Sequence, residues 1–294
     1  MQHRKVIILS GATGFLGSHL LNNLLKNEYE VIILIRSSSN LWRIENLVPL
    51  VTTYNIDKCD LDLVFKRHKI DIVIHTACKY ARNECSMINV VDSNLMYGLR
   101  LLEACRRFKT KLFINTDSLL PRNVDGYSLS KKQFVDWLRF YSEGMQVINL
   151  KLEHMYGPKD DNTKLVGWFL SQLKERVPEI KLTKGEQLRD FIHIDDIVSA
   201  FSKVLESKSI SKNFSEFEVC SGKVIPVKNF LLQLKKGYED MHGISNTRLL
   251  FGAVPYRKNE MMKVDAHNHS LLKLGWMPKI ELKEGIKNTL EWYL

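Results

Sequence analysis

The chain has 294 residues, of which 43 are Lys or Arg and 33 are Asp or Glu, for a net charge of +10. Its 26% of charged and 45% of hydrophobic residues exclude a disordered or low-complexity chain. This length predicts two domains, or one enlarged domain with an appended lobe. The five cysteines form no CxxC pair, which favours a reducing compartment over a disulfide scaffold.

The positive charge is scattered in short pairs such as Arg106-Arg107 and Lys131-Lys132. A nucleic-acid-binding protein concentrates it on one helix or face, so we expect no nucleic-acid partner and favour a small anionic ligand. No apolar run reaches the roughly 18 residues that span a bilayer, so no membrane association is expected. The polar segment Ser10–Gly14 interrupts the apolar start of the chain, which predicts a strand, a turn and a helix in place of a signal peptide. We therefore expect a cytoplasmic location.

The first half of the chain alternates short β-branched runs with amphipathic stretches of helical length. The runs are almost continuously apolar, which is typical of strands buried on both faces of a parallel sheet. This alternation predicts a Rossmann-type, doubly wound parallel α/β sheet over residues 1–155, forming an NADP-binding domain. The predicted strands are Val6–Ser10, Val31–Ile35, Ile72–His75, Lys111–Asn115 and Gln146–Leu150.

Beyond about residue 155 the alternation weakens. Helices are predicted near Val166–Arg176, Ile194–Glu206 and Val227–Glu239, with loops between them. We expect residues 156–294 to form a smaller, mostly C-terminal α/β lobe that binds the substrate and interleaves with the first domain at its edges.

A glycine-rich turn follows the first predicted strand and precedes a helix predicted over His19–Lys26. Glycines at such a turn let the backbone approach a pyrophosphate, and the N-terminus of the following helix attracts its charge. The GxxGxxG spacing therefore predicts nucleotide binding. The predicted phosphate-site residues are Gly11, Thr13, Gly14, Phe15, Leu16 and Gly17.

Arg36 and Ser37 follow the second predicted strand. A carboxylate at this place would bind the ribose 2′-hydroxyl of NAD, whereas a cation with hydroxyls accommodates the 2′-phosphate of NADP. We therefore predict NADP(H), with NAD as an open alternative. The competing interpretation is an arginine in a solvated loop.

Tyr127 and Lys131 have YxxxK spacing, which places both side chains on one face of a helix. A nearby ammonium is expected to lower the pKa of the tyrosine, which would then donate a proton to a carbonyl oxygen. Such spacing also arises by chance. It gains weight here because Thr116 stands at the carboxyl end of a predicted strand, where its hydroxyl would hold the substrate carbonyl.

With these motifs the chain resembles the extended short-chain dehydrogenases/reductases, the NAD-dependent epimerase/dehydratase superfamily, over essentially its whole length. His75–Cys78 resembles the HxAA motif, Arg189–Asp196 the RDFIHVDD motif and Leu274–Pro278 the LGWxP motif. The resemblance implies a homodimer and a catalytic triad of Thr116, Tyr127 and Lys131, with Lys131 also binding the nicotinamide ribose. It adds Thr76, Ala77, Asn94 and Leu152 to the predicted cofactor site.

Departures from the family pattern narrow the choice among the reactions that members of this family catalyse. A 4,6-dehydratase needs an acid–base pair after the catalytic threonine, but here Asp117 is followed by Ser118. Three segments are closer to the reductases of the CDP-abequose synthase group, which reduce a CDP-4-keto-3,6-dideoxyhexose in bacterial O-antigen and lipopolysaccharide synthesis. These segments are Lys151–Pro158, Gly185–Asp190 and Phe251–Met262.

The expected activity is therefore NADPH-dependent reduction at C4 of a nucleotide-linked 4-keto-6-deoxy or 3,6-dideoxy sugar. CDP is the favoured nucleotide, and dTDP, GDP and UDP stay open. The predicted substrate-binding residues are Lys79, Asp117, Ser118, Glu153, His154, Arg189, Arg257 and Glu260, with Tyr80 and Arg82 expected at the same mouth.

Two alternatives remain. One is a nucleotide-sugar 4-epimerase with tightly bound NAD, and the other is a non-catalytic, NADP-binding regulatory protein. Glu153 and His154 are also compatible with a purely structural loop. No metal site is expected, because His267 and His269 have no further ligands nearby in the sequence.

Overall fold

The computed structural model describes residues 4–81 and 86–293. It contains two compact units, of which the first comprises Met1–Lys151 and Phe201–Phe217 and the second Leu152–Ala200 and Glu218–Leu294. The chain therefore returns to the first unit after entering the second.

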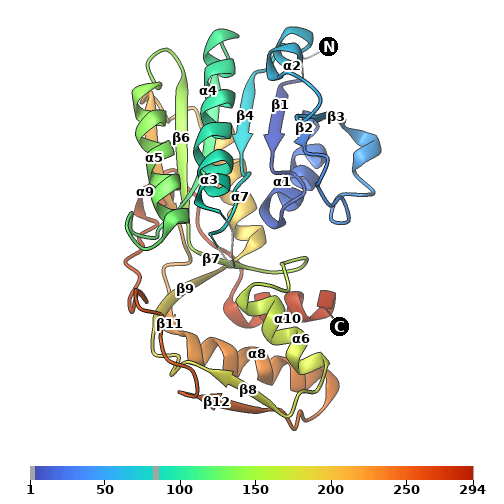
Figure 1. The fold of residues 1–294 in the computed structure, drawn as a ribbon, viewed down its shortest axis with the longest axis vertical. Helices are drawn as coiled ribbons and strands as arrows, with labels where there is room; N and C mark the ends of the chain where they lie inside the picture. The colour runs from blue at the N-terminus through green and yellow to red at the C-terminus, as the bar shows by residue number, and fades with distance from the viewer. Residues whose placement is uncertain (1–3, 82–85, 294) are drawn as a thin grey trace. The chain divides into compact units, whose positions relative to one another are not determined.

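The first unit is built on a seven-stranded sheet with the strand order β10-β6-β5-β4-β1-β2-β3 (Figure 1). The pairs β1–β2, β1–β4, β2–β3 and β4–β5 are all parallel. This topology confirms the predicted Rossmann-type fold. The strands are β1 (Val6–Ser10), β2 (Glu30–Ile35), β3 (Thr52–Asn55), β4 (Ile72–His75), β5 (Leu112–Ser118), β6 (Gln146–Leu152) and β10 (Phe214–Val219).

Helices connect these strands. They are α1 (Phe15–Lys26), α2 (Leu61–Arg67), α3 (Met87–Val91), α4 (Tyr97–Arg107) and α5 (Gly126–Phe140), with a π-helical segment, Asp92–Met96, between α3 and α4. Helix α7 (Ile194–Glu206) precedes β10, and the chain passes from the second unit to the first within it, between Ala200 and Phe201. None of the helices in the described part of the chain combines the length and apolar content needed to span a bilayer.

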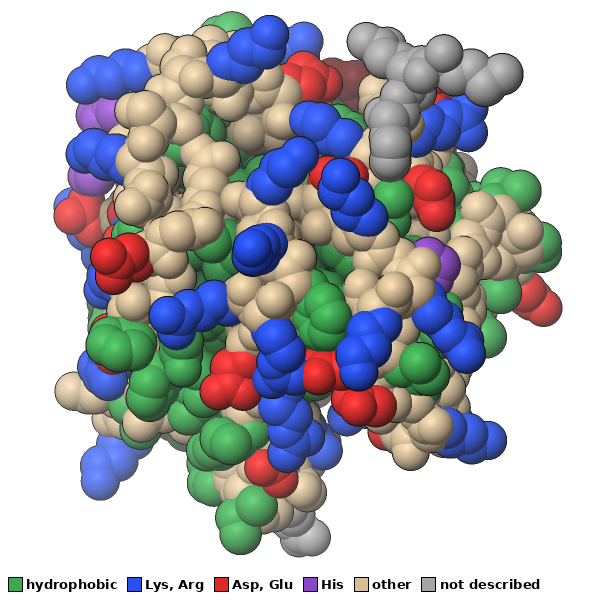
Figure 2. Space-filling model, turned by 90° about the horizontal axis from the view of Figure 1, so that it is seen from above, with side chains coloured by type: hydrophobic (Ala, Val, Ile, Leu, Met, Phe, Trp, Pro, Cys, Tyr) green, Lys and Arg blue, Asp and Glu red, His purple; other side chains and the backbone are tan. Residues whose placement is uncertain are grey.

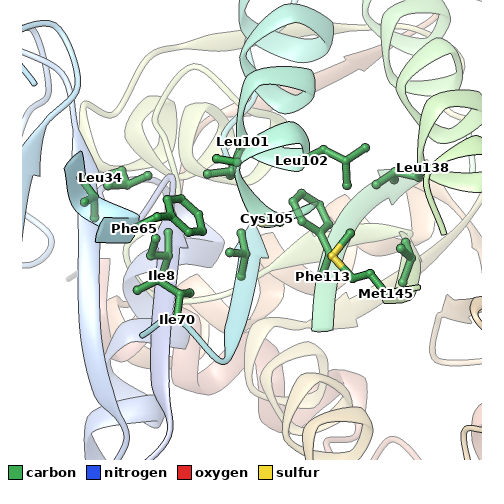
Figure 3. Packing of buried hydrophobic residues seen from close by; sticks show 14 of the residues in the cluster. Ile8, Leu34, Phe65, Ile70, Leu101, Leu102, Cys105, Phe113, Leu138 and Met145 are labelled. Atoms are coloured by element: carbon green, nitrogen blue, oxygen red, sulfur yellow. The ribbon is translucent and has the colours of Figure 1, made fainter. Parts of the chain in front are cut away.

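The core of the first unit lies between the sheet and two of these helices. Figure 3 shows Ile8 of β1 and Phe113 of β5 on the sheet side, and Leu101 of α4 and Leu138 of α5 on the helix side. All four side chains are 0% exposed. Burial of this apolar surface fixes α4 and α5 against the sheet, and α5 carries the predicted catalytic pair.

The second unit holds a three-stranded sheet, in the order β11-β9-β7, and a two-stranded sheet of β8 and β12. Phe191 and Phe230 stack in its core with ring centroids 3.7 Å apart. The strands are β7 (His154–Tyr156), β8 (Glu179–Leu182), β9 (Leu188–His193), β11 (Val224–Pro226) and β12 (Arg248–Phe251), and the helices are α6 (Leu165–Lys174), α8 (Val227–His242), α9 (His269–Lys273) and α10 (Leu282–Tyr293).

Positive charge is spread over the face shown in Figure 2, where Lys and Arg side chains alternate with acidic and apolar ones. The arrangement on this face matches the scatter of basic residues along the sequence.

Candidate active site

The carboxyl ends of neighbouring strands meet at the middle of the first unit's sheet. Ser10 ends β1 and lies opposite His75, which ends β4. The strand order reverses at this pair, because β2 follows on one side of β1 and β4 lies on the other. Open α/β sheets bind ligands outside the carboxyl ends of their strands at such a reversal. The ends of β1, β4 and β5 are therefore the candidate site of this unit.

The glycine-rich turn lies against the segment that follows β4. Gly11 has a φ of +79°, and a Cβ on it would stand 2.5 Å from the backbone N of Ala77 and 2.7 Å from Thr76 Oγ1. A Cβ on Gly17 would overlap the Gly11 carbonyl oxygen. Because backbone atoms cannot move aside as a flexible side chain can, these two positions require glycine.

Helix α1 begins at Phe15, earlier than the predicted His19, with Gly14 as an N-cap that supplies no side-chain hydrogen bond. Its first N–H groups and its positive dipole end are thus available to an anion. The side chains of Phe15 and Leu16 are buried, so only their backbone N–H groups could bind the phosphate as predicted. The Thr13 side chain is half-buried.

A capping box starts helix α5. The Asp125 carboxylate accepts a hydrogen bond from the Ser128 N–H (2.7 Å), and the Ser128 hydroxyl accepts one from the Asp125 N–H (3.1 Å). This cap places Tyr127 in the first turn, and Lys131 follows one turn later on the same face. Both side chains are buried, and the Tyr127 ring packs on Tyr80 with centroids 4.8 Å apart.

Burial raises the pKa of Tyr127 well above its ordinary value of 10.0, and Cys78, Tyr80, Asp117 and Asp125 add to the rise. The prediction of a lowered pKa for Tyr127 is therefore wrong for this structure, because desolvation of the phenolate is the largest effect and the nearby charges act in the same direction. The phenol stays protonated at neutral pH, which is the form that donates a proton.

Lys131 is 1% exposed, and its Nζ has no hydrogen-bond partner within residues 4–81 and 86–293. Burial lowers the pKa of this lysine. An unpaired buried ammonium is energetically costly, so such a group points to an acceptor supplied by a ligand. The hydroxyls of a dinucleotide ribose are acceptors of this kind. Together with the glycine turn, Lys131 fits a nicotinamide dinucleotide.

The ends of β1, β4 and β5 are joined by side-chain hydrogen bonds. Ser10 Oγ lies 2.7 Å from His75 Nδ1, and the Thr76 hydroxyl donates to the Ser10 carbonyl oxygen (2.8 Å). The Thr116 hydroxyl donates to the His75 carbonyl oxygen (3.1 Å). Burial, with a smaller contribution from Lys131, lowers the pKa of His75 to about 3, so the imidazole is neutral.

Asn94 lies in the π-helical segment and is 0% exposed. Its Oδ1 accepts from the Lys79 N–H (2.7 Å), and its Nδ2 donates to the Lys79 carbonyl oxygen (2.9 Å) and to Ser130 Oγ (3.0 Å). The amide thereby ties the segment after β4 to helix α5. Contact between Asn94 and a cofactor remains a prediction, whereas its positioning contacts are observed.

The loop after β2 is tied to the loop after β3, an arrangement the sequence did not reveal. The Ser37 N–H donates to Asp57 Oδ2 (2.7 Å), and Asn55 Nδ2 donates to Ser37 Oγ (3.0 Å). Arg36 is exposed. Arg43, which sequence reasoning also missed, places its Nη1 3.5 Å from the Thr13 carbonyl oxygen of the glycine turn.

Asp117 and Ser118 end β5 and are followed by the loop to α5. Lys132, the neighbour of the predicted catalytic lysine, donates to Asp117 Oδ2 (2.6 Å) and to the Ser118 carbonyl oxygen (2.5 Å). In the sequence, Lys132 stands out only as one half of a basic pair, and no local pattern predicts its contact with Asp117 and Ser118.

The second unit brings together another group of predicted residues. Arg189 of β9 donates to Glu260 Oε1 (2.7 Å), and Glu153 adds to the negative charge near Arg189. Glu153 Oε2 accepts from the His154 N–H (3.1 Å) and lies 2.8 Å from His154 Nδ1. Leu152 is buried at the end of β6, and Arg257 is exposed, with its carbonyl oxygen accepting the Glu260 N–H.

Arg82, predicted at the substrate mouth, lies outside the described residues. Within the described residues, no group of three His, Cys, Asp or Glu side chains is arranged to hold a metal ion.

Fold and site together define a dinucleotide-binding protein of the doubly wound class. The model of the NAD dependent epimerase/dehydratase family matches residues 7–220. The chain belongs to this family, whose members are enzymes that depend on a nicotinamide dinucleotide.

Similarity extends along almost the whole chain. It is 33% identical to a CDP-abequose synthase of Salmonella muenchen, with 97% of both chains covered. It is 30% identical to the CDP-abequose synthase of Salmonella typhimurium, with 98% of both covered. Among solved structures, UDP-glucose 4-epimerase of Thermotoga maritima matches with a TM-score of 0.84 and 23% identity over 98% of both chains, which supports the fold.

The low pKa of His75 predicts a specific pH dependence of stability. An unfolded chain binds a proton to this histidine near its ordinary pKa of 6.5, whereas the folded chain does so only at about 3. The free energy of unfolding should therefore fall as the pH is lowered from about 6.5 towards 3. Replacing His75 with Phe should remove up to ~1.4 kcal/mol per pH unit from this slope, which denaturant titrations at several pH values would measure.

A ring of similar shape suits this place, because His75 packs among the rings of Tyr97, Phe113 and Phe134. Equal slopes for the wild type and His75→Phe would contradict this prediction, because they would show that the imidazole binds a proton as readily in the folded chain as in the unfolded one.

Proposed function

We propose that this chain reduces the C4 ketone of a nucleotide-linked 4-keto-6-deoxy or 3,6-dideoxy sugar, with CDP as the favoured nucleotide and NADPH as the favoured reductant. The observation that carries the proposal is the 30–33% identity to CDP-abequose synthases over nearly the entire chain. The buried Tyr127 and Lys131 supply the chemistry that such a reduction needs.

Three side chains of the first unit carry the proposed reaction. The Tyr127 phenol, kept protonated by its raised pKa, donates its proton to the C4 oxygen. The Thr116 hydroxyl binds the same oxygen, for which it must turn away from the His75 carbonyl oxygen. Lys131 binds the dinucleotide ribose through its ammonium, which has no hydrogen-bond partner among the residues that the structure describes. When bound, a reduced nicotinamide supplies the hydride.

The preference for NADPH rests on cations near the adenosine end of the site. Arg36 follows β2, and Arg43 reaches the glycine turn at Thr13. Arginine binds phosphate with paired, charge-assisted hydrogen bonds. The Asp57 carboxylate already occupies the Ser37 N–H, so a 2′-phosphate would be held by the arginine side chains and the Ser37 hydroxyl.

For the nucleotide sugar, we propose Arg189 and Arg257 as ligands of the diphosphate. Glu260 holds the Arg189 guanidinium in place, and Lys79, Glu153 and His154 are proposed as further substrate contacts. A cytoplasmic location suits an enzyme that consumes NADPH, and Cys59, Cys78, Cys105 and Cys220 are free thiols.

Dehydration and epimerisation are the neighbouring reactions in this family. Ser118 has a hydroxyl where a dehydratase needs its second acid–base group, which speaks against elimination of water. An epimerase keeps its NAD and needs no added reductant. Purified protein that retains NAD and interconverts two sugars without NADPH would replace the proposed function with epimerisation.

A homodimer is proposed through the helices of the first unit. Leu129, Trp137 and Phe140 lie within one narrow arc of α5, and Met96 stands just before α4. Exposed large apolar side chains clustered on helices are typical of a subunit contact. The exposed fractions of Leu129, Trp137, Phe140 and Met96 are 37%, 42%, 71% and 39%, respectively.

The Tyr127→Phe variant tests the reaction. Loss of the proton donor should lower kcat for reduction of a CDP-4-keto-3,6-dideoxyhexose by roughly 100- to 10,000-fold. NADPH binding, followed by the fluorescence of the reduced nicotinamide, should stay intact. Tyr141→Phe, which removes a hydroxyl at the C-terminal end of the same helix, is the matched control and should keep full activity. Normal turnover by Tyr127→Phe would overturn the assignment.

Cofactor choice is tested at Arg36. Arg36→Glu should reduce the ratio of kcat/KM for NADPH to that for NADH by roughly 10- to 100-fold, because a charge-assisted phosphate contact becomes repulsive. The control Arg67→Glu alters another exposed arginine, at the end of α2, and should leave the ratio unchanged. A wild type that prefers NADH would contradict the NADP proposal.

Subunit association is tested on α5. The double variant Trp137→Glu/Phe140→Glu should halve the molar mass measured by light scattering after size exclusion, because charges in an apolar interface are costly. The control Ile244→Glu places a charge on an apolar side chain that is 91% exposed, just beyond α8. A wild type that elutes as a monomer would refute the homodimer.

A further inference from the structure

A buried ion pair lies beside the proposed catalytic residues. Lys132 Nζ is 2.6 Å from Asp117 Oδ2, and the side chains are 19% and 1% exposed, respectively. The same ammonium binds the Ser118 carbonyl oxygen, so one lysine holds the end of β5 at two points. A carboxylate buried this deeply requires a charged partner, and Lys132 provides it.

Only one of the two Asp117 carboxylate oxygens, Oδ2, takes part in this ion pair. Asp117 Oδ1 is buried without a hydrogen-bond partner in the described part of the chain, and so is the Ser118 hydroxyl. Native structures leave few such atoms unsatisfied, and those that remain call for an explanation such as a ligand. An anionic oxygen with no partner can accept a hydrogen bond from the hydroxyl of a sugar.

Burial of an ion pair does not by itself produce an unused oxygen. Lys164 and Asp160 form a pair of nearly equal burial, with side chains 20% and 2% exposed and a separation of 3.0 Å. Asp160 Oδ1 also accepts the Asp161 N–H, and neither Asp160 oxygen is left buried without a partner in the described ranges. The unused Asp117 oxygen is therefore a particular feature of the site.

Asp117 lies close enough to the proposed catalytic pair to influence both members. Its charge contributes to the raised pKa of Tyr127 and opposes the lowering of the pKa of Lys131. Lys131 and Lys132 are successive on α5 and act differently: Lys131 Nζ has no hydrogen-bond partner among the described residues, whereas Lys132 Nζ is bound to the end of β5.

We infer that Lys132 is a positioning residue: it holds the Asp117 carboxylate by one oxygen so that the other accepts a hydroxyl of the sugar substrate. The inference deepens the proposed function and rests on it. Lys132 touches neither the ketone nor the cofactor in this scheme. It acts through Asp117, and its contribution is to binding of the sugar rather than to proton transfer.

Four variants test this role in the full-length protein, with NADPH and a CDP-4-keto-3,6-dideoxyhexose. Lys132→Met should raise the KM of the sugar nucleotide roughly 10- to 100-fold, the size expected for a hydrogen bond to a charged group, with a much smaller change in kcat. Lys132→Arg, which keeps the charge and the donors, should restore most of the affinity. Asp117→Asn should reproduce the loss, and Lys132→Met/Asp117→Asn should be no worse than Asp117→Asn.

Lys164→Met is the matched control, because it breaks the ion pair of equal burial elsewhere in the chain, and it should leave the KM unchanged. Fluorescence of bound NADPH reports whether each variant is folded. If Lys132→Met fails to bind NADPH, the variants Lys132→Arg and Asp117→Asn decide, since the inference requires a KM near that of the wild type in the first and a raised KM in the second.

An unchanged KM in Lys132→Met, an equal rise in Lys164→Met, or a rise confined to the KM of NADPH would overturn the inference while the reductase assignment stood. A wild type that turns over none of the nucleotide 4-ketosugars would overturn the proposed function and this inference together.

Discussion

Lys131 carries its ammonium into the interior of the first unit, where burial lowers its pKa and no acceptor in the described part of the chain reaches Nζ. The surrounding structure holds this costly arrangement in place. A capping box starts α5 just before Tyr127, apolar packing fixes α5 on the sheet, and Asn94 ties α5 to the segment after β4 through Ser130. The contacts that stabilise this part of the fold thus hold the buried Lys131 ammonium and the protonated Tyr127 phenol on one face of α5.

Much of this architecture could be predicted from the sequence. Continuous apolar runs identify the buried strands β1, β2, β4 and β5, and the glycine spacing identifies the turn after β1, because both signals are local. Strand β3 was missed, since its residues Thr52–Asn55 are mostly half-buried and polar. The strands of the second unit are short and separated by loops, so no periodicity marks them.

Contacts between distant segments were beyond prediction. The bonds from Ser37 to Asn55 and Asp57, and from Arg43 to Thr13, join loops that follow different strands, and no local pattern encodes them. The sign of the Tyr127 pKa shift was misjudged for a related reason. Helical spacing reveals the neighbouring lysine, but it does not reveal how completely the phenol is removed from water.

The two adjacent lysines of α5 have different electrostatic roles: one neutralises a buried carboxylate, and the other is proposed to bind a ligand. Residues i and i+1 on a helix point about 100° apart, so Lys131 and Lys132 face different surroundings although they are neighbours in sequence. Lys132 neutralises a buried carboxylate and is itself satisfied, whereas Lys131 Nζ has no hydrogen-bond partner in residues 4–81 and 86–293. The Lys131 ammonium also senses the charge of Asp117. Pairing Asp117 with the second lysine therefore leaves the first one free for a ligand.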